Sequence, residues 1–199
     1  LFSSVYDDIY SAYSILARLN IFINRTEKVD TYFGFGIGYG NGKLTDSDGN
    51  LNPSHDYTII DLLSFIADSP VVYVSAVMSG EGPSIREDKM SIQMRFADGS
   101  IGNVNYFANG SKSYPKEVLE VFSEGRILSL ENFRQVRGFD FRGFKIFRTR
   151  RQDKGHNQEV AEFIRCVENG GNALIPFNEL VNVTMASFAA VESAKTNKV

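Results

Sequence analysis

Apolar residues recur at the spacing of an amphipathic helix in several stretches of this chain. Residues at i, i+3, i+4 and i+7 share one face of a helix, so the pattern marks a face that packs on a core. It predicts helices near residues 3–19, 56–67, 156–169 and 178–194. The third helix has the clearest stripe and ends at a pair of glycines, a common C-terminal cap; the stripe is Val160, Phe163, Ile164 and Val167. The apolar side predicted for the last helix is Leu180, Val183, Phe188 and Val191.

Between residues 71 and 150 the apolar period falls to two, which is typical of half-buried strands. A further strand is expected over residues 28–39, followed by a polar, glycine-rich loop over residues 40–52. Turn signals such as Asp98-Gly99 favour hairpin connections. The sequence therefore predicts an α+β fold: a mostly antiparallel, open sheet over residues 71–150 with the helices on one face. We expect residues 1–199 to form a single domain.

The alternation also predicts what each face of the sheet carries. The face that packs on the helices holds Ile92, Met94, Phe96, Val104 and Tyr106. The opposite face holds Gln93, Arg95, Asn103 and Asn105, beside Phe139, Phe141, Phe144 and Phe147. A face of that composition is too apolar to stay in water and polar enough for a hydrogen-bonded interface. We therefore expect at least a homodimer through the open sheet.

Composition and charge narrow the classes of partner. Hydrophobic residues make up 43% of the chain and charged residues 23%, which is ordinary for a globular protein. A net charge of −3 lacks the positive field that attracts nucleic acid or anionic membranes. The single cysteine, Cys166, allows no intrachain disulfide and suits a reducing compartment, so a cytoplasmic protein is expected.

Several cofactor-binding and catalytic motifs are matched only in part, because residues that they require are absent. Glycines stand at alternate positions from Gly34 to Gly42, but they match neither of two phosphate-binding motifs. The dinucleotide fingerprint lacks the glycine required at its sixth position, and the P-loop lacks a required glycine as well. We interpret them as a strand with a glycine face that another layer can approach closely. Residues 46–50 fail the spacing of a calcium loop. One cysteine and two well-separated histidines argue against a dedicated zinc site. The G-x-S-x-G motif of a nucleophile elbow does not occur in the sequence. No cofactor-binding or metal residue is assigned.

Five ordered segments carry a resemblance to a known family: residues 91–102 (SIQMRFADGSIG), 113–122 (SYPKEVLEVF), 124–126 (EGR), 154–163 (KGHNQEVAEF) and 175–180 (IPFNEL). They resemble the C-terminal domain of the glucose–fructose oxidoreductase/inositol dehydrogenase family, Gfo/Idh/MocA, near the members that act on sugars of bacterial polysaccharides. The fold that this implies is the C-terminal domain of the glyceraldehyde-3-phosphate-dehydrogenase type.

The resemblance also implies a function. Family members place a Rossmann domain, which binds NAD or NADP, before this domain, and they oxidise or reduce a sugar carbon. The chain begins at Leu1 and contains no such domain, so we expect the substrate-binding and oligomerisation part of a sugar or nucleotide-sugar dehydrogenase. Alone, it should be inactive and bind no cofactor.

The family's catalytic histidine is missing at its usual place. Many members carry an Asp-x-x-x-His pattern, and the matching positions here are Ser54 and Thr58. A hydroxyl is no general base near pH 7, so the catalytic residue stays unknown. His55 lies three residues before Thr58, and inside a helix the two would share one face. His55 is therefore a candidate substitute, and Asp56 could present a carboxylate there; the alternative is a solvated histidine at the helix entry.

Two further candidates for substrate binding are His156 and Lys116. The resemblance places His156 in a recurring motif at a helix start, where it binds a sugar hydroxyl or ties the helix to the sheet. Lys116 would pair with a phosphate or carboxylate on the substrate, or be a solvated edge charge. The basic group Arg148, Arg150, Arg151 and Lys154 fits a nucleotide-sugar diphosphate or, alternatively, a salt-bridged surface.

Two other functions stay open. The loss of the usual histidine is compatible with a catalytically dead family member that acts as a regulatory or assembly subunit. A stand-alone sugar-binding module is the third alternative, although it would leave the apolar faces of its helices bare.

Overall fold

The computed structural model describes residues 32–38, 54–80, 86–170 and 174–196. Its elements are β1 (Tyr32–Gly38), α2 (Ser54–Ala67), β2 (Val71–Ser79), β3 (Arg86–Phe96), β4 (Ile101–Phe107), β5 (Glu117–Ser123), β6 (Arg126–Glu131), β7 (Gln135–Phe139), β8 (Ile146–Arg148), α3 (His156–Asn169) and α4 (Phe177–Thr196). The predicted helix at 3–19 and the predicted loop at 40–52 lie outside the described residues. The other three predicted helices are confirmed within two residues at each end.

The strands form one eight-stranded sheet in the order β2-β3-β4-β1-β5-β6-β7-β8. Neighbouring strands are antiparallel except β1 and β4, which run in the same direction. The mostly antiparallel α+β fold is confirmed, but the predicted limits of the sheet, residues 71–150, are too narrow. β1 enters between β4 and β5, where it pairs with partners more than 60 residues away in sequence. Hairpin signals report only local pairing and cannot reveal such an insertion.

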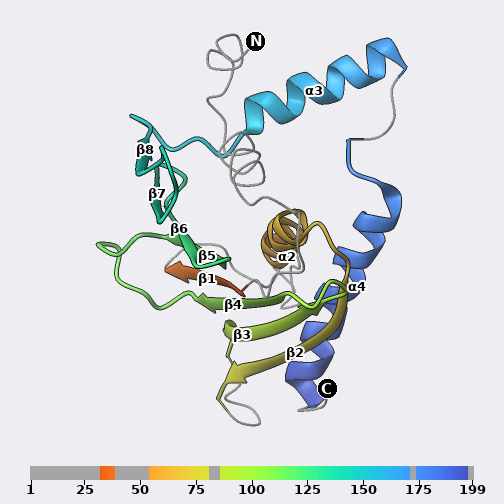
Figure 1. Ribbon diagram of the computed structural model, residues 1–199. Coiled ribbons are helices and arrows are strands. Elements are labelled where there is room, and N and C mark those ends of the chain that lie inside the picture. The colour runs from red at the N-terminus through yellow and green to blue at the C-terminus, as the bar shows by residue number, and fades with distance from the viewer. Residues whose placement is uncertain (1–31, 39–53, 81–85, 171–173, 197–199) are drawn as a thin grey trace.

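Helices α2 and α4 cover one face of the sheet (Figure 1). Ile60 and Leu63 of α2 are fully buried, and the methyl group of Leu63 lies over Gly102 at the start of β4. The strands contribute Met90, Ile92, Met94, Phe96, Val104, Tyr106, Leu119, Val121, Leu128, Leu130 and Val136 to the same core. The predicted inward face of β3 and β4 is therefore confirmed.

Helix α4 packs on β2 through small residues, unlike the prediction. Its buried residues are Val183, Ala186, Ser187, Ala190, Ser193 and Ala194. Leu180 and Phe188, predicted to face the core, are exposed. Short side chains let the helix approach the strand closely enough for polar contacts. Ser193 Oγ accepts a hydrogen bond from the backbone of Ala76 at 3.0 Å, and Asn182 bonds both backbone groups of Val71 at 2.8 and 2.9 Å.

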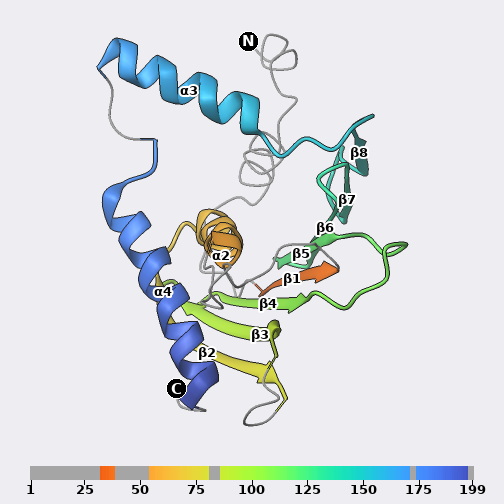
Figure 2. The same ribbon diagram turned by 180° about the vertical axis from the view of Figure 1, so that it is seen from behind.

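Helix α3 does not join the other helices on the sheet, so the expectation that all helices gather there is wrong for it. It projects from the end of the sheet in both views (Figures 1 and 2). It ends as predicted at Gly170, which adopts a left-handed conformation with φ 65° and donates to Cys166 O. The four residues of its apolar stripe are between 48% and 66% exposed. Within the described part of the chain, nothing covers this stripe.

The open face of the sheet is mixed, as predicted for its first strands. Gln93, Arg95 and Asn105 are exposed, and Ser91 Oγ donates to Asn105 Oδ1 at 2.8 Å. The exposed apolar residues Tyr73, Val77, Ile101 and Phe107 lie on the same strands. Gly34 and Gly36 of β1 pair with Asn103 and Asn105 and occupy this face too. The first three glycines of the series, Gly34, Gly36 and Gly38, are therefore part of a strand, as the sequence indicated, and the last two lie outside the described residues.

The phenylalanines predicted for the open face are mostly elsewhere. Phe141 and Phe144 lie in the β7–β8 connection, where their rings meet edge to face with centroids 6.4 Å apart. Phe141 is buried in the core, and Phe144 and Phe147 pack against it. Of the four, only Phe139 is largely exposed. The β7–β8 turn folds its aromatic rings inward, which the alternation of a continuous strand could not predict.

None of the described helices is both long and apolar enough to cross a bilayer.

Candidate functional site

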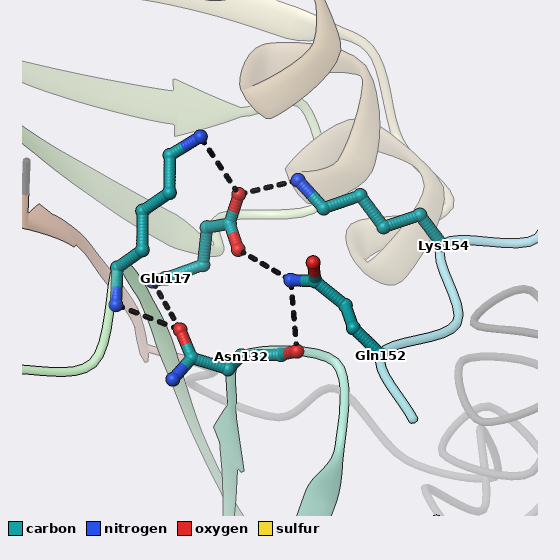
Figure 3. Close-up of polar contacts among 5 residues, drawn as sticks. Glu117, Asn132, Gln152 and Lys154 are labelled. Carbon is teal, nitrogen blue, oxygen red and sulfur yellow. Dashed lines mark hydrogen bonds and ion pairs between the residues drawn. The ribbon is translucent and has the colours of Figure 1, made fainter. Parts of the chain in front are cut away.

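A buried carboxylate lies at the start of β5, where the alternation of the strand places an inward-facing position. Glu117 shares the core face with Leu119 and Val121, and its side chain is only 8% exposed. Both carboxylate oxygens have partners (Figure 3). Lys154 Nζ forms a hydrogen-bonded ion pair with Oε1, and Gln152 Nε2 donates to Oε2 at 3.1 Å. Burial of this charge is thus compensated by an ammonium group and an amide.

A second ammonium group approaches the same oxygen. Lys116 Nζ lies 3.9 Å from Oε1 of Glu117, within ion-pair distance but beyond a hydrogen bond. The side chains of Lys116 and Lys154 are 47% and 32% exposed. One buried carboxylate therefore forms ion pairs with two lysines, and the side chains of both lysines are partly exposed to solvent.

Asn132 forms hydrogen bonds with the backbone of Lys116 and Glu117. Its Oδ1 accepts hydrogen bonds from the backbone N–H groups of Lys116 at 2.7 Å and Glu117 at 3.1 Å. Its own N–H donates to the carbonyl of Glu117 at 2.7 Å. Asn132 has φ 52°, in the left-handed region that asparagine tolerates better than most residues. Conformation and hydrogen bonding both explain the choice of asparagine at this position.

The segment that leads into α3 is fastened along the β6–β7 turn. Gln152 Nε2 also donates to the carbonyl of Asn132 at 3.0 Å, and the backbone of Asp153 donates to Phe133 O at 3.2 Å. Lys154 Nζ lies 5.5 Å from the centroid of the Phe133 ring, a cation–π contact. The Glu117 cluster, which we define as Lys116, Glu117, Asn132, Gln152 and Lys154, therefore fixes the position at which α3 begins.

Lys116 was predicted from the sequence as a candidate for substrate binding, whereas Glu117, Asn132 and Gln152 were assigned no role. Glu117 and Lys154 stand inside two of the five family-like segments. The available signal was a charged residue at an inward position of an alternating strand, which requires a partner when buried. The partners themselves lie 15 to 37 residues away in sequence, and no local pattern connects them.

The other predicted site residues are placed by their backbone alone. His55, Asp56 and Thr58 lie in the first turn of α2, which begins at Ser54. His55 and Thr58 are therefore one helical turn apart, as the prediction required. His156 is the first residue of α3 and follows Gly155, whose φ is 81°. The side chains of these four residues are not among those described, so their substrate-binding roles stay predictions.

Topology gives the direction of the chain around these residues. β1 is parallel to β4, and β4 and β2 both pair antiparallel with β3, so β1 and β2 run the same way. The end of β1 and the start of β2 therefore lie at opposite ends of these strands, and α2 stands between the two strands in sequence. Ile37 near the end of β1 pairs with Glu117, so β1 ends at the Glu117 end of the sheet.

The basic group of the sequence is only partly salt-bridged within the described part of the chain. Among the described residues, Arg148, Arg150 and Arg151 form no ion pair with a carboxylate. Arg148 donates instead to Gln135 Oε1 at 2.5 Å. Lys154 is the member of the group that is paired, with Glu117. The described residues also contain no group of three or more side chains suited to hold a metal ion.

No protein-family model matches the sequence, and comparison with curated proteins gives no match. Solved structures do match. UDP-N-acetylglucosamine 3-dehydrogenase GnnA from Acidithiobacillus ferrooxidans is 14% identical with a TM-score of 0.70, over 94% of this chain and 59% of that chain. Levoglucosan dehydrogenase in complex with NADH and L-sorbose is 16% identical with a TM-score of 0.69, over 94% and 61%. The WlbA dehydrogenase from Bordetella pertussis in complex with NADH and UDP-GlcNAcA is 13% identical with a TM-score of 0.63, over 96% and 60%.

These matches establish the fold. The chain spans about six-tenths of the length of these solved dehydrogenases, and nearly all of it superposes on them. They are oxidoreductases of the Gfo/Idh/MocA type, so the resemblance of the five sequence segments is confirmed at the level of fold.

Proposed function

We propose that this chain is the substrate-side domain of an NAD(P)-dependent oxidoreductase that acts on a sugar or a nucleotide sugar. The observation that carries the proposal is the shared fold with dehydrogenases whose structures contain NADH together with a sugar or nucleotide sugar. The five family-like segments support it independently of the fold, because they are a property of the amino-acid sequence alone.

The exposed apolar residues of α3 and α4 support the proposal that a separate cofactor-binding domain packs against this chain. The apolar stripe of α3 continues in kind on the first half of α4, where Phe177 is 79% and Met185 60% exposed. No described residue covers these side chains, and exposed apolar surface of this extent is typical of a contact with another domain or protein. A nucleotide-binding domain, which the solved dehydrogenases have room for in the other four-tenths of their length, fits this requirement.

Within the proposed enzyme, the nicotinamide would accept or donate hydride at a sugar carbon. This chain would bind the sugar and manage the proton of its hydroxyl group. We assign substrate contact to His55, Asp56 and Thr58 on α2, to Lys116 of the Glu117 cluster, and to His156 at the start of α3. Thr58 stands where the family histidine is expected and is no base, so His55 or Asp56 would take the proton.

The open sheet is the proposed surface for a homodimer. Tyr73, Val77 and Phe107 present apolar area on a face that also carries Asn105 and Arg95. Arg95 already stacks over the Tyr73 ring at 5.8 Å, which orders both side chains before association. All residues of a two-fold contact through this face would come from the sheet of this chain, so the dimer would need no other domain.

Two measurements test the proposed function. The chain alone, titrated calorimetrically with NAD and NADP, should show no micromolar binding; such binding would contradict a separate cofactor domain. Joined to the proposed nucleotide-binding domain, it should reduce NAD(P) with a sugar or nucleotide sugar as the second substrate, followed by absorbance of the reduced cofactor.

The alternative of a catalytically dead regulatory or assembly subunit rests on Ser54 and Thr58. His55→Ala distinguishes the two functions in the joined protein, with Lys145→Ala as a control on the distant β7–β8 turn. Activity that falls in His55→Ala alone supports the enzyme. Absence of turnover with every sugar tried, while the protein still binds a partner enzyme, supports the alternative.

A further inference from the structure

The part of the chain from Asn132 to Lys154 has a charge opposite to that of the whole. It contains eight basic and two acidic residues, in a chain with a net charge of −3. Seven of the basic side chains are exposed and form no ion pair with a carboxylate in the described part of the molecule: Arg134, Arg137, Arg142, Lys145, Arg148, Arg150 and Arg151. Unpaired cations concentrated on one edge of an acidic chain attract anions.

The backbone brings part of this charge to the Glu117 cluster. After β8 the chain runs back along the β6–β7 turn, where Thr149 N donates to Arg134 O at 2.8 Å. Arg134 Nη2 donates to Arg150 O at 3.4 Å, so its guanidinium lies along the same segment. Three residues beyond Arg151 the chain reaches Lys154. This segment therefore leads from the arginines of the turn to Lys154, one of the two lysines at Glu117.

Two acidic side chains at this end, Glu117 and Asp153, are already engaged. Glu117 is buried, with Lys154 and Gln152 on its two oxygens. Asp153 Oδ1 accepts the backbone N–H of Gly155 at 2.9 Å. Lys116 is only 3.9 Å from Glu117 without a hydrogen bond, and nearly half of its side chain is open to solvent. An incoming anion would meet ammonium groups that are held in place and only partly neutralised.

We propose that Lys116 and Lys154 form an oxyanion subsite for a negatively charged group on the substrate. The inference rests on the proposed function and narrows it to anionic sugars, with either a diphosphate or a ring carboxylate as the bound group. Glu117 orients Lys154 and leaves one ammonium charge in excess for the ligand. The competing explanation is that edge cations only prevent sheet-to-sheet aggregation, and it requires no saturable site.

The test is binding of two small probes to the 199-residue chain at constant ionic strength. Inorganic pyrophosphate represents the diphosphate and glucuronate represents the ring carboxylate; binding is followed by amide chemical shifts in 15N-labelled protein. We expect one probe to saturate, with shifts centred on Lys116, Glu117 and Asn132, and the probe that binds identifies the group. Lys116→Met should weaken binding about three- to tenfold, whereas Lys145→Met, also an exposed lysine, should not.

Lys154→Met should weaken binding as well, although it removes the partner of a buried carboxylate and can unfold the chain. Lys116→Met keeps the Lys154–Glu117 pair, so the proposal remains testable if Lys154→Met does not fold. Linear, non-saturating shifts with both probes would overturn the proposal, as would equal losses in Lys116→Met and Lys145→Met. Saturable binding by the chain, together with no turnover of any sugar or nucleotide sugar once the chain is joined to the proposed nucleotide-binding domain, would refute the proposed function and leave the subsite standing.

Discussion

The contribution of Asn132 can be separated into its two parts by three substitutions at one position. Asn132→Asp keeps a side-chain acceptor and a residue that tolerates the left-handed region. Asn132→Gly removes the acceptor but suits the positive φ. Asn132→Ala removes the acceptor and also puts a Cβ-bearing residue without a local hydrogen bond at φ 52°.

The structure sets the expected size of each change. Asn132 Oδ1 accepts two backbone N–H groups, of which that of Lys116 is exposed and that of Glu117 partly buried. Water replaces the first at little cost, so losing the acceptor should destabilise the chain by about 1–2 kcal/mol. In the glycine variant, relief of backbone strain and greater freedom of the unfolded chain oppose each other by about 1 kcal/mol each. The alanine variant adds the left-handed penalty, for a total of about 2–4 kcal/mol.

Urea unfolding followed by circular dichroism measures these differences, provided that the slope of each transition stays unchanged. The expected order of stability is Asn132→Asp close to the native chain, then Asn132→Gly, then Asn132→Ala. The same variants should loosen the start of α3, which amide exchange at Gly155 reports.

Two results would refute this reasoning. If Asn132→Gly is as stable as the native chain, the bonds to Lys116 and Glu117 contribute nothing. If Asn132→Ala equals Asn132→Gly, the left-handed conformation is not a cost at this site.

Three further outcomes are expected. Leu63→Ala, at a fully buried position over Gly102, should cost about 2–5 kcal/mol in urea unfolding, and a loss below 1 kcal/mol would contradict the packing of α2 on the sheet. Asn182→Ala removes both hydrogen bonds to the backbone of Val71 and should cost about 1–3 kcal/mol, whereas Asn169→Ala at the exposed end of α3 should cost less. Phe107→Glu on the open face should convert the proposed dimer into a monomer in sedimentation without loss of helix signal; a native chain that already sediments as a 22.2 kDa monomer would disprove the dimer.

The candidate site was only partly accessible from sequence. Lys116 was identified by its charge in a family-like segment, and the structure places it against Glu117. The role of Glu117 depends on its hydrogen bonds with Gln152 and Lys154, and three strands separate these residues from Glu117 in sequence. Charge pairing across such a distance is decided by strand order, which no local pattern contains.

The sequence alone determined the elements and the faces that they bury where the physics is local. Helical periodicity located α2, α3 and α4, and alternation along β3 and β4 separated core from open face because each pattern follows from backbone geometry. Only the tertiary structure decided that β1 inserts beside β4, that α4 packs through alanine and serine rather than Leu180 and Phe188, and that no described residue covers the apolar stripe of α3. These outcomes depend on which surfaces meet, and a helix shows the same apolar stripe whether its partner is its own sheet or another body.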